Sequence, residues 1–185
     1  EDTKSDRERY NTVFSNILGA VAAPTASLNL TDEILAEIKK KGAKITKVEL
    51  RVGWGTFSPI REENIEEHKI HNEYINVSKQ SADIVNECKG RVWAFGTTVV
   101  RALESAYSKE EEKVVPFSGY TDLYIYPGYK CRVVDVLVTN FHMPDSSLIL
   151  LVTAFAGKEN IKKAYEEAIK KKYKFLSYGD SMLIK

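Results

Sequence analysis

The chain has 185 residues, of which 43% are hydrophobic and 29% charged, and its formal net charge is +1. This length and composition are typical of a globular protein with a sizeable core, and the near-zero charge excludes a whole-molecule basic field that would attract polyanions. The two cysteines lack metal-ligand spacing, and no apolar run reaches the roughly 18 residues of a membrane-spanning helix. We therefore expect a soluble protein of a reducing compartment, without a membrane partner.

Helices and short strands alternate along the chain. Thr31 and Ser78 are predicted N-caps, and Gly42 is a predicted helix stop. In chain order, the apolar spacing predicts a helix over 32–41, strands over 45–52 and 74–77, a helix over 79–88, a strand over 92–95, a helix over 99–108, strands over 123–126 and 133–138, and helices over 146–155 and 159–173. This alternation predicts one layered α/β domain over residues 1–185.

Three polar loops follow predicted strands, at the ends where α/β sheets bind ligands. Glycines there let a ligand approach the backbone, and free N–H groups at a helix start bind anions. The alternative is that these loops are only caps and tight turns. The loops are GWGTF with Gly53, Gly55, Thr56 and Phe57, GTT with Gly96, Thr97 and Thr98, and TNFHMPDSS with Thr139, Asn140, Phe141 and His142.

The three histidines are the natural candidates for proton transfer, because imidazole titrates near neutral pH. His142 lies between two apolar segments, where Asn140 and Asp145 can orient it. His68 and His71 would share a face if their segment were helical. An HxxH pair without a third ligand is only a weak metal signal, and a solvated charged helix is the alternative for this segment.

Three further features carry alternatives. Arg101 follows GTT by one helical turn and could bind a carboxylate or phosphate, or it could pair with Glu104. The C-terminal YGDSM, with Tyr178 and Asp180, could close over a site or form a plain turn. Lysine runs such as 170–172 could follow a phosphate backbone, although solvated helix faces are commoner.

Seven stretches of the chain together resemble one family, the S-adenosylmethionine:tRNA ribosyltransferase-isomerases of queuosine biosynthesis. They cover most of the chain in the family's order, and the TNFHMP block is specific on its own. The stretches are VAAPTASL (21–28), VGWGTF (52–57), EEHKIHNEY (66–74), FGTTVVRALES (95–105), TDLYIYPGY (121–129), DVLVTNFHMPDSSLILLVTAFAG (135–157) and YGDSMLI (178–184).

The resemblance implies a three-layer α/β/α domain that carries a separate β-barrel domain. Family members are considerably longer, so we expect this chain to be the later half, with the barrel missing. The implied reaction transfers and isomerises the ribosyl part of S-adenosylmethionine onto the aminomethyl-deazaguanine wobble base of tRNA with a GUN anticodon, giving epoxyqueuosine, adenine and methionine. S-adenosylmethionine is consumed as a substrate, no metal is required, and the cytoplasm is the expected location.

The implied chemistry assigns roles to the motif residues. A base must remove a proton from the ribose carbon beside the sulfonium, and an acid can assist the departure of adenine. His142, or His68 with His71, is the expected catalytic group. The expected substrate-binding residues are Pro24, Thr25, Gly53, Gly55, Thr56, Phe57, Gly96, Thr97, Thr98, Arg101, Thr139, Asn140, Phe141, Tyr178 and Asp180. Within this set, Phe57 or Phe141 could stack on adenine or on the modified base.

Two residues depart from the family's pattern. Asn29 and Arg51 stand where the family usually has histidine, so the chain lacks two imidazoles beside the expected site. The alternative function is therefore a catalytically degenerate relative that binds tRNA or a nucleoside without turnover. An unrelated α/β hydrolase is disfavoured, because the chain has no GxSxG motif.

Overall fold

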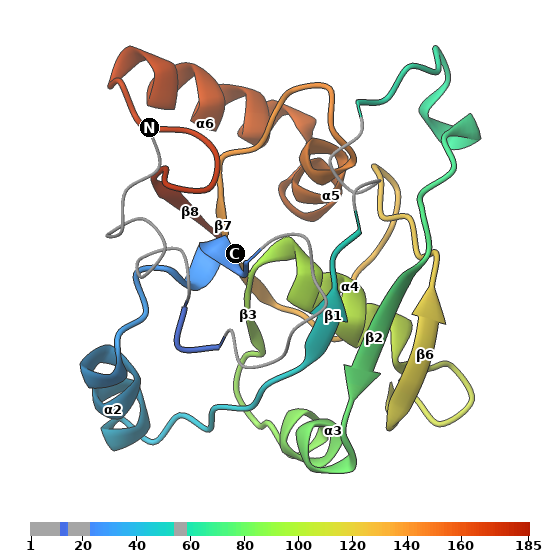
Figure 1. Cartoon of the computed structure of the whole chain (residues 1–185), viewed down its shortest axis with the longest axis vertical. Helices are drawn as coiled ribbons and strands as arrows, with labels where there is room; N and C mark the ends of the chain where they lie inside the picture. Colours follow the sequence, from blue (N-terminus) through green and yellow to red (C-terminus); the bar gives the residue numbers. More distant parts are fainter. Residues whose placement is uncertain (1–11, 15–22, 54–58) are drawn as a thin grey trace.

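The computed structural model describes residues 12–14, 23–53 and 59–185, and it confirms the predicted α/β class (Figure 1). In chain order its elements are η1 (Thr25–Ser27), α2 (Asp32–Lys40), β1 (Glu49–Arg51), η3 (Ile65–Glu67), β2 (Glu73–Val77), α3 (Lys79–Asn86), β3 (Trp93–Phe95), α4 (Thr97–Ser105), β4 (Tyr107–Ser108), β5 (Lys113–Val114), β6 (Phe117–Thr121), β7 (Val136–Asn140), α5 (Ser147–Ala156), α6 (Lys158–Lys170) and β8 (Ser181–Ile184).

Two three-stranded sheets organise the described residues. One has the order β3-β7-β8, in which β3 and β7 are parallel and β7 and β8 antiparallel. The other, β1-β2-β6, is antiparallel throughout, and β4 and β5 form a separate ribbon. The parallel pair arises because α4 provides part of the crossover connection between β3 and β7.

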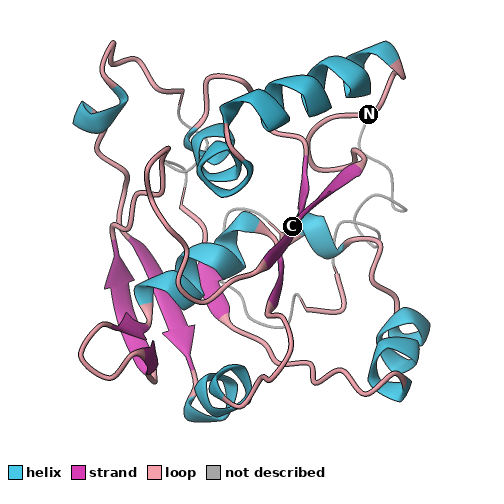
Figure 2. Cartoon of the chain, turned by 180° about the vertical axis from the view of Figure 1, so that it is seen from behind, coloured by secondary structure: helices cyan, strands magenta, loops and turns pink. Residues whose placement is uncertain are grey.

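Helix α4 lies between the two sheets and contacts both of them, as the views from front and back agree (Figures 1 and 2). Its sequence, TTVVRALES, buries Val100, Ala102 and Leu103 in the main hydrophobic cluster. The same cluster includes Ile75 of β2 and Leu137 of β7, so α4 joins the two sheets through one continuous core.

The helix starts follow local side-chain chemistry. Thr31 Oγ1 accepts a hydrogen bond from the Ile34 N–H at 3.3 Å, and Ser78 Oγ accepts one from the Ser81 N–H at 3.1 Å. Both N-cap predictions are therefore confirmed. Ser146 precedes α5 but makes no such bond; its hydroxyl instead donates to the Met143 carbonyl at 2.8 Å.

The structure corrects three predicted strands: the one over 123–126 is absent, the one over 45–52 is shorter, and the one over 133–138 is shifted to Val136–Asn140. Residues 123–126 are not a strand, because side chains satisfy the backbone there: the Leu123 N–H donates to Thr121 Oγ1, and its carbonyl accepts from Arg101. The strand of this region is β6, with the sequence FSGYT, in which Ser and Gly obscure the alternation of apolar and polar residues that is typical of a strand. The predicted strand over 45–52 shrinks to β1.

Among the residues that the structure describes, no helix has both the length and the apolarity to cross a membrane. The apolar helix α5 has ten residues, and its Leu151 and Val152 are buried in the protein core.

Candidate functional site

The parallel pairing of β3 with β7 brings GTT and TNFH to one edge of the sheet. Phe95 pairs with Val138, and the Gly96 N–H donates to the Val138 carbonyl at 2.8 Å. Thr97 and His142 therefore follow neighbouring strand ends at one edge of the sheet. Gly96 has φ 105°, a conformation that favours glycine, and a Cβ there would lie 3.3 Å from Thr98 Oγ1.

The VAAPTASL motif reaches the same edge. Thr25, the first residue of η1, donates from its hydroxyl to Asn140 Oδ1 at 3.1 Å, across 115 residues of sequence. Ala26 lies next to Gly96, since a Cβ on that glycine would be 3.7 Å from the Ala26 Cβ. Three motifs that are distant in sequence thus meet at the ends of β3 and β7. We call this group the strand-end cluster.

A cavity of about 380 Å³ opens beside the strand-end cluster and shares Thr25 with it. This volume is within the range of roughly 300–1,000 Å³ of small-molecule sites. Its described lining contains the carboxylates of Asp32 and Glu33 and no cationic side chain, so the cavity favours a cationic ligand. A hydrogen bond from Thr31 lowers the pKa of the fully exposed Glu33 carboxyl, which keeps it ionised. We call this space the strand-end cavity.

Asn29 also lines the strand-end cavity, and so do Tyr178 and Gly179 of the C-terminal turn. A Cβ on Gly179 would collide with the Lys174 carbonyl, so this turn requires glycine. The Asp180 carboxylate accepts from the Lys174 N–H at 2.8 Å, which gives Asp180 a structural part in the turn. YGDSM is therefore both a packed turn and a wall of the cavity.

His142 is held in the strand-end cluster and is neutral at physiological pH. Its Nε2 lies 3.0 Å from Thr139 Oγ1, and its backbone N–H donates to the Tyr165 hydroxyl of α6 at 2.8 Å. Burial lowers the pKa of His142 from 6.5 to about 4, because a charged imidazolium would lose its hydration. His142 can thus accept a proton, but its basicity at neutral pH is low.

Phe141 is part of the core, contrary to its expected stacking role. Its side chain is 3% exposed, and its ring centroid lies 5.3 Å from that of Tyr165, 6.0 Å from Tyr173 and 5.0 Å from Phe175. These three rings surround Phe141, so it anchors the TNFH loop and is not available to stack on a base.

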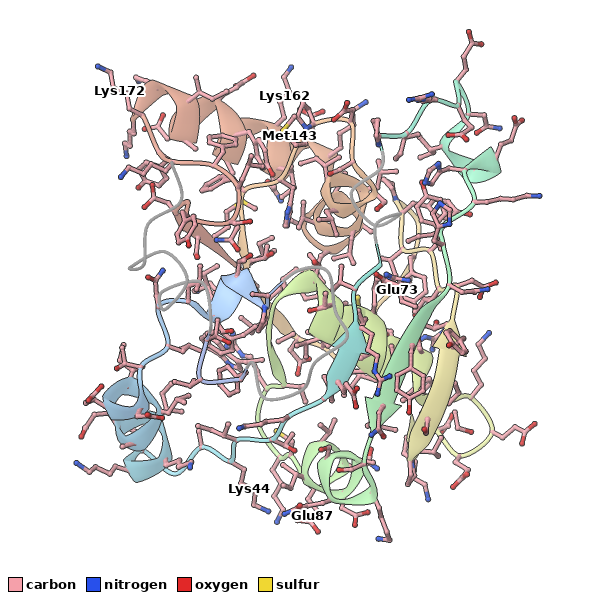
Figure 3. The ribbon with its side chains drawn as sticks, viewed as in Figure 1. Lys44, Glu73, Glu87, Met143, Lys162 and Lys172 are labelled. Atoms are coloured by element: carbon pink, nitrogen blue, oxygen red, sulfur yellow. The ribbon has the colours of Figure 1, made fainter. Side chains whose placement is uncertain are left out.

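Arg101 forms a buried ion pair with Glu73, which Figure 3 labels in the middle of the molecule. Glu73 also accepts from the Gly53 N–H at 3.0 Å, so it ties the start of GWGTF to α4. The alternative pairing of Arg101 with Glu104 is wrong, because the Glu104 carboxylate accepts from backbone N–H groups of residues 132–134. Arg101 Nη2 is buried without a hydrogen-bond partner in the described part of the chain.

The EEHKIHNEY segment is not one helix, so the predicted shared face of His68 and His71 is wrong. Only η3 is helical there, His71 is exposed, and His68 Nδ1 lies 2.9 Å from Glu62 Oε2. The His68 side chain is 11% exposed, and its ring lies 5.6 Å from that of Tyr124. The hydrogen bond from His68 lowers the pKa of the Glu62 carboxyl. Glu62 and His68 therefore form a carboxylate–imidazole pair.

Backbone contacts connect this pair's segment to the TNFHMPDSS loop. The Ile60 N–H donates to the Asp145 carbonyl at 2.8 Å, and Pro59 forms a bridge with Ser146. Figure 1 nevertheless draws the segment around η3 and strand β8 on opposite sides of α5, so this segment lies apart from the strand-end cluster. Gly55, Thr56 and Phe57 fall outside the described residues. Within those residues, no group of three or more His, Cys, Asp or Glu side chains could hold a metal ion.

The sequence profile of the family described as "Queuosine biosynthesis protein" matches residues 2–184. The chain belongs to this family. It is 53% identical over 184 residues to the S-adenosylmethionine:tRNA ribosyltransferase-isomerase of Chlorobaculum parvum, and 51% identical over 187 residues to the protein of that name from Treponema denticola.

These alignments cover 97% and 100% of the chain but 54% of each relative, so the chain spans about half the length of the curated relatives it matches. Among solved structures, the chain is similar to the crystal structure of the S-adenosylmethionine tRNA ribosyltransferase of Thermotoga maritima. The TM-score is 0.69 at 38% identity, and the match covers 87% of this chain and 51% of that chain. The family and fold resemblance drawn from the motifs is therefore confirmed.

The sequence analysis did not identify four acidic residues of these regions. Glu62 and Glu73 lie in or beside a segment rich in acids, and the sequence does not show that Glu62 pairs with an imidazole or that Glu73 pairs with an arginine. Asp32 and Glu33 have a signal, namely acids in the first turn of a helix, but it also fits ordinary helix stabilisation. Only the folded chain shows that these two also line a cavity.

Proposed function

We propose that the chain carries the substrate site of an S-adenosylmethionine:tRNA ribosyltransferase-isomerase that acts in the cytoplasm. The reaction moves and isomerises the ribosyl part of S-adenosylmethionine onto the aminomethyl-deazaguanine wobble base of tRNA with a GUN anticodon. The products are epoxyqueuosine, adenine and methionine. The names of its relatives, which are more than half identical to it over nearly the whole chain, support this assignment.

The observation that carries the proposal is the charge of the strand-end cavity. S-adenosylmethionine is a sulfonium cation, and the described cavity wall holds Asp32 and Glu33 without a cationic side chain. Thr25 lines this cavity, and its hydroxyl donates to Asn140 Oδ1; a hydroxyl at this place suits the hydroxyls of a ribose. A cationic nucleoside matches both features.

Proton transfer is assigned to one of two histidines. His142 already belongs to the strand-end cluster. His68 lies on a segment apart from that cluster, but its pairing with Glu62, in which a carboxylate orients an imidazole, is the usual arrangement of a general base.

A pH–rate profile separates these two bases. If His68 removes the proton, His68→Asn lowers the rate by about 10²-fold or more, and His142→Asn has the smaller effect. If His142 does so, the acid limb lies near its pKa of about 4, and His142→Asn has the larger effect. An unchanged rate in both variants would remove both histidines from the chemistry.

The activity itself is tested by incubating the chain with S-adenosylmethionine and with tRNA that carries the aminomethyl-deazaguanine base. Mass spectrometry of the digested nucleosides then reports epoxyqueuosine, and tRNA without the precursor base is the control. Binding of tRNA without product would support the second candidate function, a relative without turnover, which Asn29 on the cavity wall favours. Neither binding nor product would overturn both.

A further inference from the structure

The antiparallel sheet presents an aromatic row on its outer face. Glu73, Ile75 and Val77 of β2 are buried, so the alternation of the strand directs Tyr74 to the opposite face. The strand register pairs Tyr74 with Arg51 on one side and with Tyr120 on the other. These three residues, Arg51, Tyr74 and Tyr120, are called the outer aromatic row.

Neighbouring side chains hold the rings of the outer aromatic row in place, and its last ring, Tyr120, is exposed. The Arg51 guanidinium carbon lies 4.6 Å from the centre of the Tyr74 ring, and the Tyr74 and Tyr120 rings meet edge to face at 5.8 Å. The Tyr74 hydroxyl lies 2.8 Å from Ser118 Oγ, which fixes its ring. Tyr120 ends the row and is 73% exposed. A ring that its neighbour already orients loses little entropy when a flat ligand stacks on it.

A second cavity, of about 670 Å³, opens at β6, and Tyr120 is part of its lining. Its lining includes three exposed cations, Lys109, Lys130 and Arg132. These cations form no ion pair within the residues that the structure describes. The acids of the lining are the exposed Asp122 and the buried Glu104. The Glu104 carboxylate accepts from backbone N–H groups of residues 132–134 and from the Tyr129 hydroxyl, so most of its charge is compensated.

We propose that the outer aromatic row and the second cavity bind unpaired nucleotides of an RNA strand. A base stacks on Tyr120, and the flanking phosphates contact Lys109, Lys130 and Arg132. Single strands are recognised in this way, by aromatic rings for the bases and cations for the backbone. The proposal rests on the proposed tRNA substrate and adds a docking surface away from the strand-end cavity. Exposed cations that form no ion pair among the described residues, beside an open aromatic ring, favour a polyanion with flat bases over a protein.

The test measures the affinity of the folded chain for a short unpaired oligouridine by fluorescence anisotropy, without S-adenosylmethionine. We expect Tyr120→Ala to weaken binding by about ten-fold or more, the usual scale for a lost base–aromatic stack. We expect Lys130→Gln to flatten the dependence of affinity on salt by roughly one released counterion. Because Tyr120 and Lys130 are exposed, both variants should fold, as circular dichroism can verify.

The matched controls are Ile169→Ala, which removes another exposed apolar side chain (66% exposed), and Lys162→Gln on α6. Both should bind oligouridine like the parent chain. Equal affinity of Tyr120→Ala and the parent would overturn the proposal. So would dimerisation of the parent that Tyr120→Ala abolishes without an effect on RNA, because the face would then bind a second copy. Nucleoside analysis, done separately, tests the proposed reaction, so the two failures are distinguishable.

Discussion

The lowered pKa of His142 makes stability depend on pH in a way that one substitution can isolate. In the unfolded chain His142 takes up a proton around pH 6.5, whereas in the folded chain burial delays this until about pH 4. Between these values the unfolded state binds more protons than the folded state. The neutral histidine therefore contributes stability above pH 6.5 that is lost as the pH falls.

The size of this loss follows from the two pKa values. Each pKa unit corresponds to 1.36 kcal/mol, so the linkage costs about 2 kcal/mol between pH 7 and pH 5 and about 3 kcal/mol by pH 4. A domain of this size is stable by roughly 5–15 kcal/mol, so the loss is measurable. The assay is urea unfolding of the parent chain and of His142→Gln at pH 7 and at pH 5.

We expect the free energy of unfolding of the parent to fall by about 2 kcal/mol more than that of His142→Gln between the two pH values. Other titrating groups are common to both proteins and cancel in this difference. Any pH-independent cost of the substitution also cancels, because each protein is compared with itself. Equal falls in the two proteins would show that His142 is solvated in the folded state, and the argument for its neutral role would be withdrawn.

Three further predictions concern other parts of the chain. Glu73→Gln leaves the Arg101 charge buried without its partner and should cost about 3–5 kcal/mol of unfolding free energy. The control is Glu87→Gln in the surface pair with Lys44, which Figure 3 labels, and it should cost about 1 kcal/mol or less. Similar costs of the two variants would refute the buried pair. Gly96→Ala should cost about 1–3 kcal/mol through its positive φ, as thermal unfolding against the parent can measure, and no cost would mean that the loop relaxes freely. Gln at Lys170–Lys172 should flatten the salt dependence of tRNA binding, and an unchanged slope would make these ordinary surface lysines.

The helix starts could be predicted from the sequence, because they depend on local side-chain chemistry. Thr31 and Ser78 cap helices because a hydroxyl at that position satisfies a free N–H, whatever surrounds it. The apolar runs at 92–95 and 133–138 predicted where β3 and β7 lie along the chain. β8 was missed because residues 181–184 become a strand only by pairing with β7, which lies far away in the sequence.

Part of the candidate site could also be predicted from the sequence. The positions of Gly96 and Asn140 at strand ends could be predicted, because glycine and a short polar side chain are typical of such ends. The charge state of His142 could not be predicted, because its burial comes from the tertiary fold, in which Tyr165 of the distant helix α6 contacts its backbone. The partner of Arg101 could not be predicted either, since Glu73 lies 28 residues away, on strand β2.

The two departures from the family's pattern fall on different surfaces, so they bear differently on the choice between enzyme and binder. Asn29 lines the strand-end cavity, where an imidazole would offer a titratable group next to Asp32 and Glu33, and an amide cannot take its place in proton transfer. Arg51 lies in the outer aromatic row, where its planar guanidinium covers the Tyr74 ring as a flat imidazole could. Restoring histidine should therefore affect different measurements: Asn29→His the rate of nucleoside modification, and Arg51→His the affinity for RNA. A change in the rate with Arg51→His alone would instead place the reacting groups on the outer face of the sheet.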